Sequence, residues 1–183
     1  DKNYPILIDQ EGGRVNRLKK FFNTDSLTSE LFGELYLKDK KKFYAFYNIF
    51  IDQTSFLLKS IGVNINTLPV LDLRSKGSSS IIGDRSFSGN SKIVSKLGDI
   101  CINKFHSNKI GTVIKHIPGH GLAKVDSHKL TPSVKKDLNY LMKNDFLAFK
   151  NKSSFFAMTA HIIYTDIDKL NTATHSKKII ELI

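Results

Sequence analysis

The residues GTVIKHIPGHG, at positions 111–121, indicate the fold class more clearly than any other part of the chain. Gly111 to Lys115 is a short apolar run that favours a buried strand, and a loop interrupted by Pro118 and two glycines follows it. Lys115 and His116 therefore come at the carboxyl end of the predicted strand. Polar residues in that place are typical of ligand sites in parallel α/β folds.

The same order of strand, loop and helix is repeated on both sides of this stretch. Three further apolar runs favour strands: Tyr4 to Ile8, Val63 to Val70 and Ser154 to Ala160. Apolar residues at spacings of three and four predict helices over Thr28–Ser60, with a break near Asp39, and over Ser91–Phe105 and Asp137–Phe149. This alternation predicts an α/β fold with a parallel sheet.

Each predicted strand is followed by polar residues, among them Asp9, Asp72, Lys115 and His161. Such groups gather at one end of the sheet in open α/β folds and in (β/α)8 barrels alike. Four strands cannot close a barrel of this kind, which typically needs about 250 residues. The pattern alone therefore leaves two alternatives, an open sheet or a part of a larger barrel.

The composition narrows the class of protein without identifying a partner. The 183 residues suit one domain, and no apolar run approaches the roughly 18 residues that a membrane span needs. The net charge of +11 raises the question of nucleic acid, but the lysines are spread out, with one short cluster at Lys38 to Lys42 and no nucleic-acid motif. We expect neither nucleic acid nor a membrane as a partner. The lone Cys101 and the absence of a signal-peptide pattern favour the cytoplasm.

The loop from Lys115 to His128 concentrates His116, His120, Asp126 and His128 in one connection. It can be a polar surface loop, a metal site built on the three histidines, or a proton-transfer site. We favour the third interpretation, because no HExxH pattern is present and extended backbone would place Asp126 and His128 on the same side. A carboxylate can orient a histidine that gives and takes a proton near neutral pH.

Two other segments carry groups that suit ligand binding. In DQEGGRVNR, residues 9–17, Asp9 could accept hydrogen bonds from two hydroxyl groups and Arg17 could donate in a planar fork. Arg85 follows a glycine turn in IGDRSF, residues 82–87. Either segment could instead be an ordinary surface cluster of charges, and the residues alone leave this open.

Taken together, these segments resemble the family 3 glycoside hydrolases. IDQEGGRV at residues 8–15, LPVLD at 68–72, GDRSF at 83–87, and KHIPGHG at 115–121 with DSH at 126–128 are similar, in this order, to motifs of that family. The DSH motif resembles the branch of bacterial β-N-acetylglucosaminidases that includes the cytoplasmic enzyme of peptidoglycan recycling. The resemblance implies a (β/α)8 TIM-barrel fold, an enzyme without metal or organic cofactor, and a small carbohydrate substrate such as an N-acetylglucosaminyl muropeptide.

The resemblance also implies roles for seven residues. His128 matches the general acid/base and Asp126 its partner. Binding of N-acetylglucosamine beside the cleaved bond is implied for Asp9, Arg17, Arg85, Lys115 and His116.

The family's nucleophile is an aspartate in an SDDL-like stretch on a later strand, and no such stretch is found in residues 1–183. The family's first strand and helix, which precede IDQEGGRV, are not found either. We therefore expect a single catalytic domain over residues 1–183 that is incomplete at both ends, a partial barrel that would not turn over alone, and a monomer. A non-catalytic sugar-binding relative and a metal-dependent barrel hydrolase stay open as alternatives.

Overall fold

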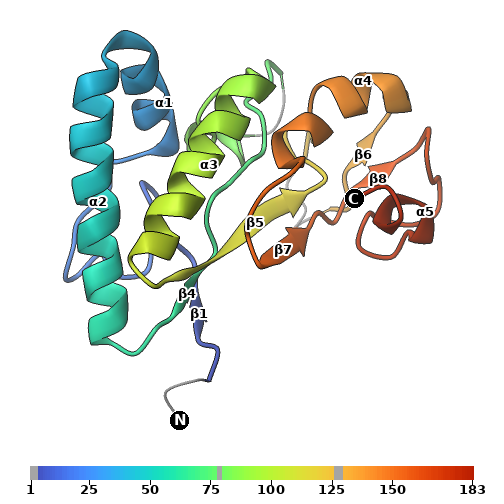
Figure 1. Ribbon diagram of the computed structural model, residues 1–183. Helices are drawn as coiled ribbons and strands as arrows, with labels where there is room; N and C mark the ends of the chain where they lie inside the picture. Colours follow the sequence, from blue (N-terminus) through green and yellow to red (C-terminus); the bar gives the residue numbers. More distant parts are fainter. Residues whose placement is uncertain (1–3, 78–79, 126–129) are drawn as a thin grey trace.

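The computed structural model describes residues 4–77, 80–125 and 130–183. It contains a four-stranded sheet in which all strands are parallel (Figure 1). The order across the sheet is β1 (Leu7–Ile8), β4 (Ile65–Asn66), β5 (Gly111–Ile117) and β7 (Phe156–Thr159). The α/β class and the parallel sheet predicted from the sequence are thus confirmed.

The helices α1 (Ser29–Lys38), α2 (Lys40–Ser60) and α3 (Ser91–Ser107) lie together on one side of this sheet (Figure 1). The predicted break after α1 falls at Asp39, whose backbone is extended and whose side chain accepts a hydrogen bond from the Lys42 amide at 3.0 Å. Asp39 therefore ends one helix and caps the next. Gly62 follows α2 with φ of 80°, the left-handed conformation that suits a helix end.

Shorter elements complete the chain. They are the hairpin β2 (Gln10–Gly12) and β3 (Val15–Asn16), the 3-10 turn η1 (Gly83–Arg85), the parallel pair β6 (Ser133–Val134) and β8 (Ile163–Tyr164), α4 (Leu138–Lys143), η2 (Phe146–Phe149) and α5 (Lys177–Ile180). Among the helices of the described ranges, none is both long enough and apolar enough to span a bilayer.

Several predicted elements are shorter in the structure. The strand expected over Tyr4–Ile8 is regular only at Leu7–Ile8, and the strand expected over Ser154–Ala160 only at Phe156–Thr159. The strand expected over Val63–Val70 is regular only at Ile65–Asn66, because Pro69 has no amide hydrogen, and Val70 forms one isolated bridge to Lys115. The helix expected over Asp137–Phe149 ends at Lys143, because Asn144 leaves helical backbone angles at φ −122° and ψ −92°, and the chain continues as η2.

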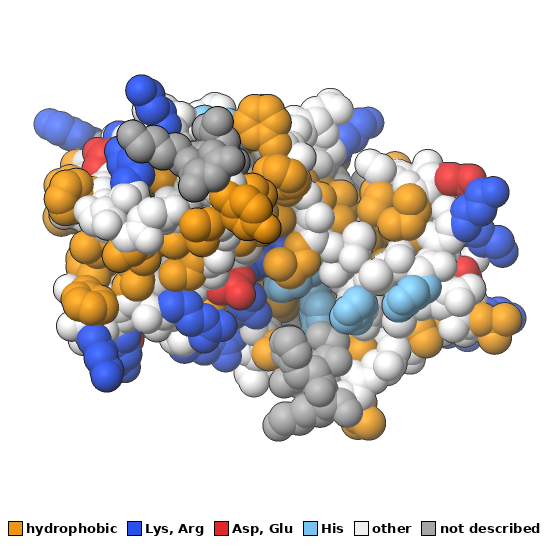
Figure 2. All heavy atoms as spheres, turned by 90° about the horizontal axis from the view of Figure 1, so that it is seen from below, with side chains coloured by type: hydrophobic (Ala, Val, Ile, Leu, Met, Phe, Trp, Pro, Cys, Tyr) orange, Lys and Arg blue, Asp and Glu red, His pale blue; other side chains and the backbone are white. Residues whose placement is uncertain are grey.

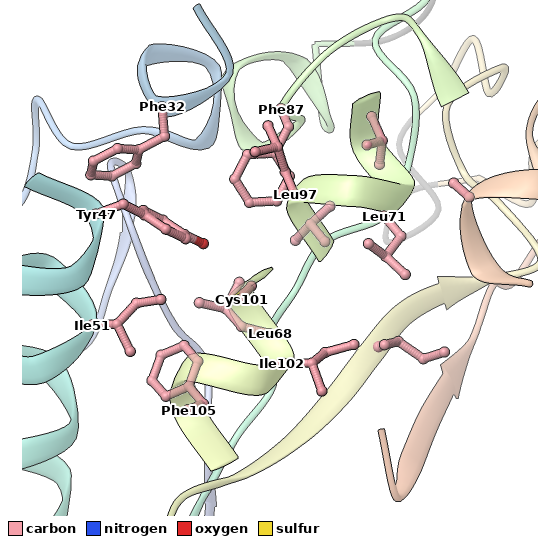
Figure 3. Close-up of a cluster of buried hydrophobic side chains, with 14 of the residues drawn as sticks. Phe32, Tyr47, Ile51, Leu68, Leu71, Phe87, Leu97, Cys101, Ile102 and Phe105 are labelled. Atoms are coloured by element: carbon pink, nitrogen blue, oxygen red, sulfur yellow. The ribbon is translucent and has the colours of Figure 1, made fainter. Parts of the chain in front are cut away.

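The main hydrophobic core lies between the helical layer and the sheet. Figure 3 shows Tyr47 of α2 pointing toward Cys101 of α3, with Phe32 of α1 next to Tyr47. Leu68 and Leu71 lie beside the α3 side chains. Each such side chain is buried, and burial of one large apolar side chain contributes roughly 1.5–3 kcal/mol. This core fixes the helices against the strands whose carboxyl ends carry the polar groups.

The two outer strands of the sheet expose apolar side chains. Leu7 on β1 is 51% exposed and Phe156 on β7 is 50% exposed, and within the described residues neither strand has a second partner. Parallel strands are normally buried on both faces and pair on both sides in a closed barrel. The described part of the sheet is therefore open at both outer strands and does not form a closed barrel.

Candidate active site

A cavity of about 440 Å³, which we call the strand-end cavity, lies at the carboxyl ends of β1, β5 and β7. Its volume is in the range of small-molecule sites. All five predicted binding residues with described positions line it: Asp9, Arg17, Arg85, Lys115 and His116. The structure thus brings together residues that are up to 107 positions apart in the sequence.

Lys115, at the end of β5, is almost completely buried and makes three polar contacts. Its Nζ atom lies 2.8 Å from Asp9 Oδ1, 3.0 Å from Thr67 Oγ1 and 2.6 Å from Glu11 Oε1. An ammonium group has three hydrogens, so these three acceptors use all of them. Lys115 therefore positions the two carboxylates, and it would have to exchange one of them to bind a ligand directly.

Asp9 is held through one of its two carboxylate oxygens. Oδ1 accepts hydrogen bonds from Lys115 and from the Thr67 hydroxyl. Among the described residues, Oδ2 has no hydrogen bond and no ion pair. Burial alone would raise the pKa of Asp9, but the hydrogen bonds from Lys115 and Thr67 outweigh it and hold the pKa below its usual value. Asp9 is thus a carboxylate with a free oxygen at the cavity wall.

Glu11 and Arg85 form a two-point ion pair behind this wall. Arg85 donates from Nε to Glu11 Oε2 at 2.8 Å and from a terminal nitrogen to Oε1 at 2.9 Å. Burial would raise the pKa of Glu11, yet the Arg85 hydrogen bonds and the Lys115 charge lower it overall. The planar fork fixes Arg85 in orientation, as bidentate pairs do.

Asp72 orients the loop that follows β5. This fully buried carboxylate accepts from the His120 amide at 2.6 Å, and its Oδ2 lies 2.6 Å from His116 Nδ1. Burial would raise the pKa of Asp72, but the charge and the hydrogen bond of His116 lower it. Since Nδ1 is engaged by Asp72, Nε2 is the nitrogen of His116 that can contact a ligand.

Histidine side chains lie next to one another across the middle of one face of the molecule (Figure 2). The ring centroids of His116 and His120 are 5.7 Å apart, and those of His161 and His175 are 6.3 Å apart with nearly parallel planes. His161 follows β7 and also lines the strand-end cavity, where its Nδ1 lies 2.7 Å from Thr174 Oγ1. This wall is therefore rich in groups that donate and accept hydrogen bonds.

The predicted proton-transfer pair, Asp126 and His128, lies outside the described residues, and so does the third histidine of the metal alternative. Within the described ranges, no group of three His, Cys, Asp or Glu side chains is arranged to hold a metal ion. The described part of the loop, through His120, borders the strand-end cavity. The roles of Asp126 and His128 stay predictions.

Glu11, Asp72 and His161 belong to the site but were not among the predicted binding residues. Glu11 was seen only as a member of a charge cluster, and Asp72 and His161 only as polar residues at strand ends. The sequence indicated where these residues lie, because each follows a predicted strand. It did not indicate how far they are buried or which residues they contact. The exposed fractions of Glu11 and Asp72, 5% and 0%, show that both are interior charges.

A buried carboxylate next to this network leads to a prediction about pH. Asp145 is 2% exposed, its Oδ1 has no hydrogen-bond partner among the described residues, and burial, followed by the charge of Asp72, raises its pKa to about 6. The folded state therefore holds this proton more tightly than the unfolded state, and the stabilisation present at about pH 4 is lost as the pH rises through 6. We expect Asp145→Asn to become more stable relative to the wild type between pH 4 and 7, by roughly 1–3 kcal/mol in urea denaturation.

The control for this prediction is Asp166→Asn, which removes an exposed carboxylate. Its free energy of unfolding should follow that of the wild type across the same pH range. A parallel pH dependence for Asp145→Asn and the wild type would show that Asp145 is not protonated in this window.

The sequence of the chain matches a known protein family. The model of the glycosyl hydrolase family 3 N terminal domain matches residues 4–183. The chain is 35% identical over 167 residues to beta-hexosaminidase A of Pseudoalteromonas piscicida, covering 89% of the chain and 27% of that protein. It is 30% identical over 165 residues to a beta-hexosaminidase of Xanthomonas campestris pv. campestris, covering 88% of the chain and 49% of that protein. The chain thus spans between about a quarter and a half of the length of these relatives.

Solved structures agree with this placement. NagZ from Neisseria gonorrhoeae, in complex with N-trifluoroacetyl-D-glucosamine, superposes with a TM-score of 0.88 at 27% identity, over 98% of this chain and 53% of that one. A family 3 β-N-acetylglucosaminidase from Paenibacillus sp. superposes with a TM-score of 0.81 at 29% identity, over 97% and 33%. The predicted TIM-barrel-type α/β fold, present as a partial barrel, is confirmed, and the chain belongs to glycosyl hydrolase family 3.

Proposed function

We propose that this chain carries the sugar-binding part of a retaining exo-β-N-acetylglucosaminidase, with the terminal sugar in the strand-end cavity. The observation that supports this most strongly is the meeting of Asp9, Arg17, Arg85, Lys115 and His116 around one cavity. These are the residues for which the family resemblance implies sugar binding. The relatives named beta-hexosaminidase and the family 3 membership point to the same class of reaction.

The proposal gives different tasks to the residues of the cavity. Asp9, held by Lys115 and Thr67 through Oδ1, accepts from a sugar hydroxyl through Oδ2. Arg17 is exposed, lines the cavity and lowers the pKa of Asp9 through its charge. His116 donates or accepts at Nε2, and Arg85 fixes Glu11, which in turn pairs with Lys115.

Asp126 and His128 supply the proton transfers in this proposal. His128 protonates the oxygen of the leaving group while a carboxylate attacks the anomeric carbon, and it then removes a proton from the water that releases the sugar. Two displacements of this kind retain the configuration at the anomeric carbon. The resemblance assigns the attacking carboxylate to a later strand, so we propose that residues 1–183 are one catalytic domain together with that strand.

We further propose that the substrate is a muropeptide fragment, that the protein acts in the cytoplasm and that it is a monomer. The single cysteine, Cys101, is buried in the core, and burial raises its pKa to about 12, which suits an unreactive thiol in a reducing compartment. Four lysines that line a second cavity, Lys76, Lys124, Lys135 and Lys136, support an acidic substrate.

The full-length gene product should hydrolyse an aryl N-acetyl-β-D-glucosaminide, and proton NMR of the first product should show the β-anomer before mutarotation. A first product in the α-configuration would overturn the retaining mechanism. Inhibition by a chelator, reversed by added zinc, would favour the metal-dependent alternative. Sugar binding without any hydrolysis would identify a non-catalytic relative.

A further inference from the structure

A second cavity, of about 870 Å³, is lined by Lys76, Lys124, Lys135 and Lys136, and we call it the lysine cavity. Its lining comes from residues 74–77, Gly89, residues 122 and 124, and residues 133–136 with Tyr140. The last of these spans β6 and the start of α4, which lie beyond the end of β5 (Figure 1). Among the described residues that line the cavity none is acidic, and four are lysines.

The charge of these lysines is not compensated by ion pairs within the described residues. None of the four has a carboxylate within 4 Å, whereas Arg74 at the rim is paired with Glu30. The Nζ atom of Lys136 lies over the ring of Tyr140, 4.7 Å from its centroid, at the wall of the cavity. The nearest carboxylate in the sequence, Asp137, caps α4 by accepting from the Tyr140 amide at 2.9 Å. Several positive charges that line a concave surface attract anions strongly.

The lysine cavity and the strand-end cavity share two loops. The loop after Asp72 contributes residues 74–77 to the lysine cavity and Ile81, Ile82 and Arg85 to the strand-end cavity. The loop after β5 contributes residues 122 and 124 to the first and His120 to the second. Parts of the same two loops therefore line both cavities, and we take a group attached to a sugar in one to extend into the other.

We propose that the lysine cavity binds the carboxylates of the leaving group when the terminal sugar occupies the strand-end cavity. This inference rests on the proposed glycosidase function and specifies its substrate as a glycoside whose leaving group carries an acidic peptide. A peptide with two or three carboxylates matches several separated ammonium groups better than a single anion does. A nucleic acid would instead require an extended basic stripe, whereas these lysines enclose a concavity.

The test compares two substrates that differ only in charge, with the full-length gene product. One is an N-acetylglucosaminyl muramyl peptide with free carboxylates, and the other is the same compound with its carboxylates converted to amides. The variant Lys76→Glu/Lys135→Glu reverses charge on two sides of the lysine cavity. The matched control is Lys59→Glu/Lys96→Glu, which changes the net charge equally at two exposed helical positions that line none of the cavities described here.

We expect the first variant to lower kcat/KM for the acidic substrate about tenfold, and to leave kcat/KM for the amide within about twofold of the wild type. The wild-type preference for the acidic substrate should also shrink as salt is added, because screening weakens exposed charge pairs. Equal loss in both double variants, or no loss, would overturn the lysine cavity as a carboxylate site while hydrolysis of the amide upholds the glycosidase function. Failure of every form to cleave either substrate would overturn both.

Discussion

Replacing His128 by alanine in the full-length gene product should lower kcat for an unactivated N-acetylglucosaminyl disaccharide by about 100- to 10,000-fold, with little change in KM. This is the range that a positioned general acid/base contributes. The effect should be smaller in the step that expels a good leaving group, such as 4-nitrophenolate, because that group needs little protonation. Steady-state rates on both substrates measure the difference.

Two further variants test this prediction, one at Asp126, the proposed partner of His128, and one at a histidine outside the site. Asp126→Asn should lower kcat less than His128→Ala does, because the histidine is kept and only its orientation and charge are affected. His106→Gln changes a histidine near the amino end of β5, where its ring contacts Thr112 at 3.0 Å, and should leave kcat unchanged. Equal kcat for the wild type and His128→Ala on the disaccharide would remove His128 from the mechanism.

Replacing Lys115 by methionine should abolish sugar binding and lower the free energy of unfolding by about 3–5 kcal/mol, the cost of removing one partner from a buried ionic network. Lys115 is 2% exposed and neutralises Asp9 and Glu11 at the same time. Methionine fills a similar volume without the charge. Urea denaturation and calorimetric titration with N-acetylglucosamine measure the two effects.

Lys152→Met is the matched control, because Lys152 is also buried along its side chain but pairs with Asp99, a carboxylate that is 42% exposed. Asp99 can be solvated when its partner is lost, so this variant should cost less than Lys115→Met. In the double variant Lys115→Met/Glu11→Gln, part of the lost stability should return, because one uncompensated carboxylate is removed. Equal destabilisation by the two lysine variants would show that the charges around Lys115 are not coupled as the distances indicate.

The alternation of elements and the place of the polar residues were predictable from the sequence. Apolar runs and helix caps located the four strands and the break at Asp39, because these signals depend on residues close in the chain. The meeting of Asp9, Arg85 and Lys115 was predicted from the family resemblance and from the rule that strand ends meet at one edge. The contacts around the cavity agree with both.

Other features depend on contacts that no local pattern records. Glu11 resembles an exposed charge in the sequence, yet Lys115 and Arg85 arrive from segments 104 and 74 positions away and make it an interior carboxylate. Asp72 is buried for the same reason, since His116 and His120 come from the next strand and loop. The lysine cavity was not predicted, because its four lysines are spread over 61 positions and gather only when β6 and α4 fold beside the loop after Asp72.

The most decisive measurement is the ratio of kcat/KM for two chromogenic substrates, 4-nitrophenyl N-acetyl-β-D-glucosaminide and 4-nitrophenyl β-D-glucoside, cleaved by the full-length gene product. We expect the N-acetylglucosaminide to be preferred by at least about tenfold, and Lys115→Met to abolish its hydrolysis. Preference for the glucoside, or hydrolysis of neither substrate by the folded protein, would show that the strand-end cavity is not the site of a β-N-acetylglucosaminidase.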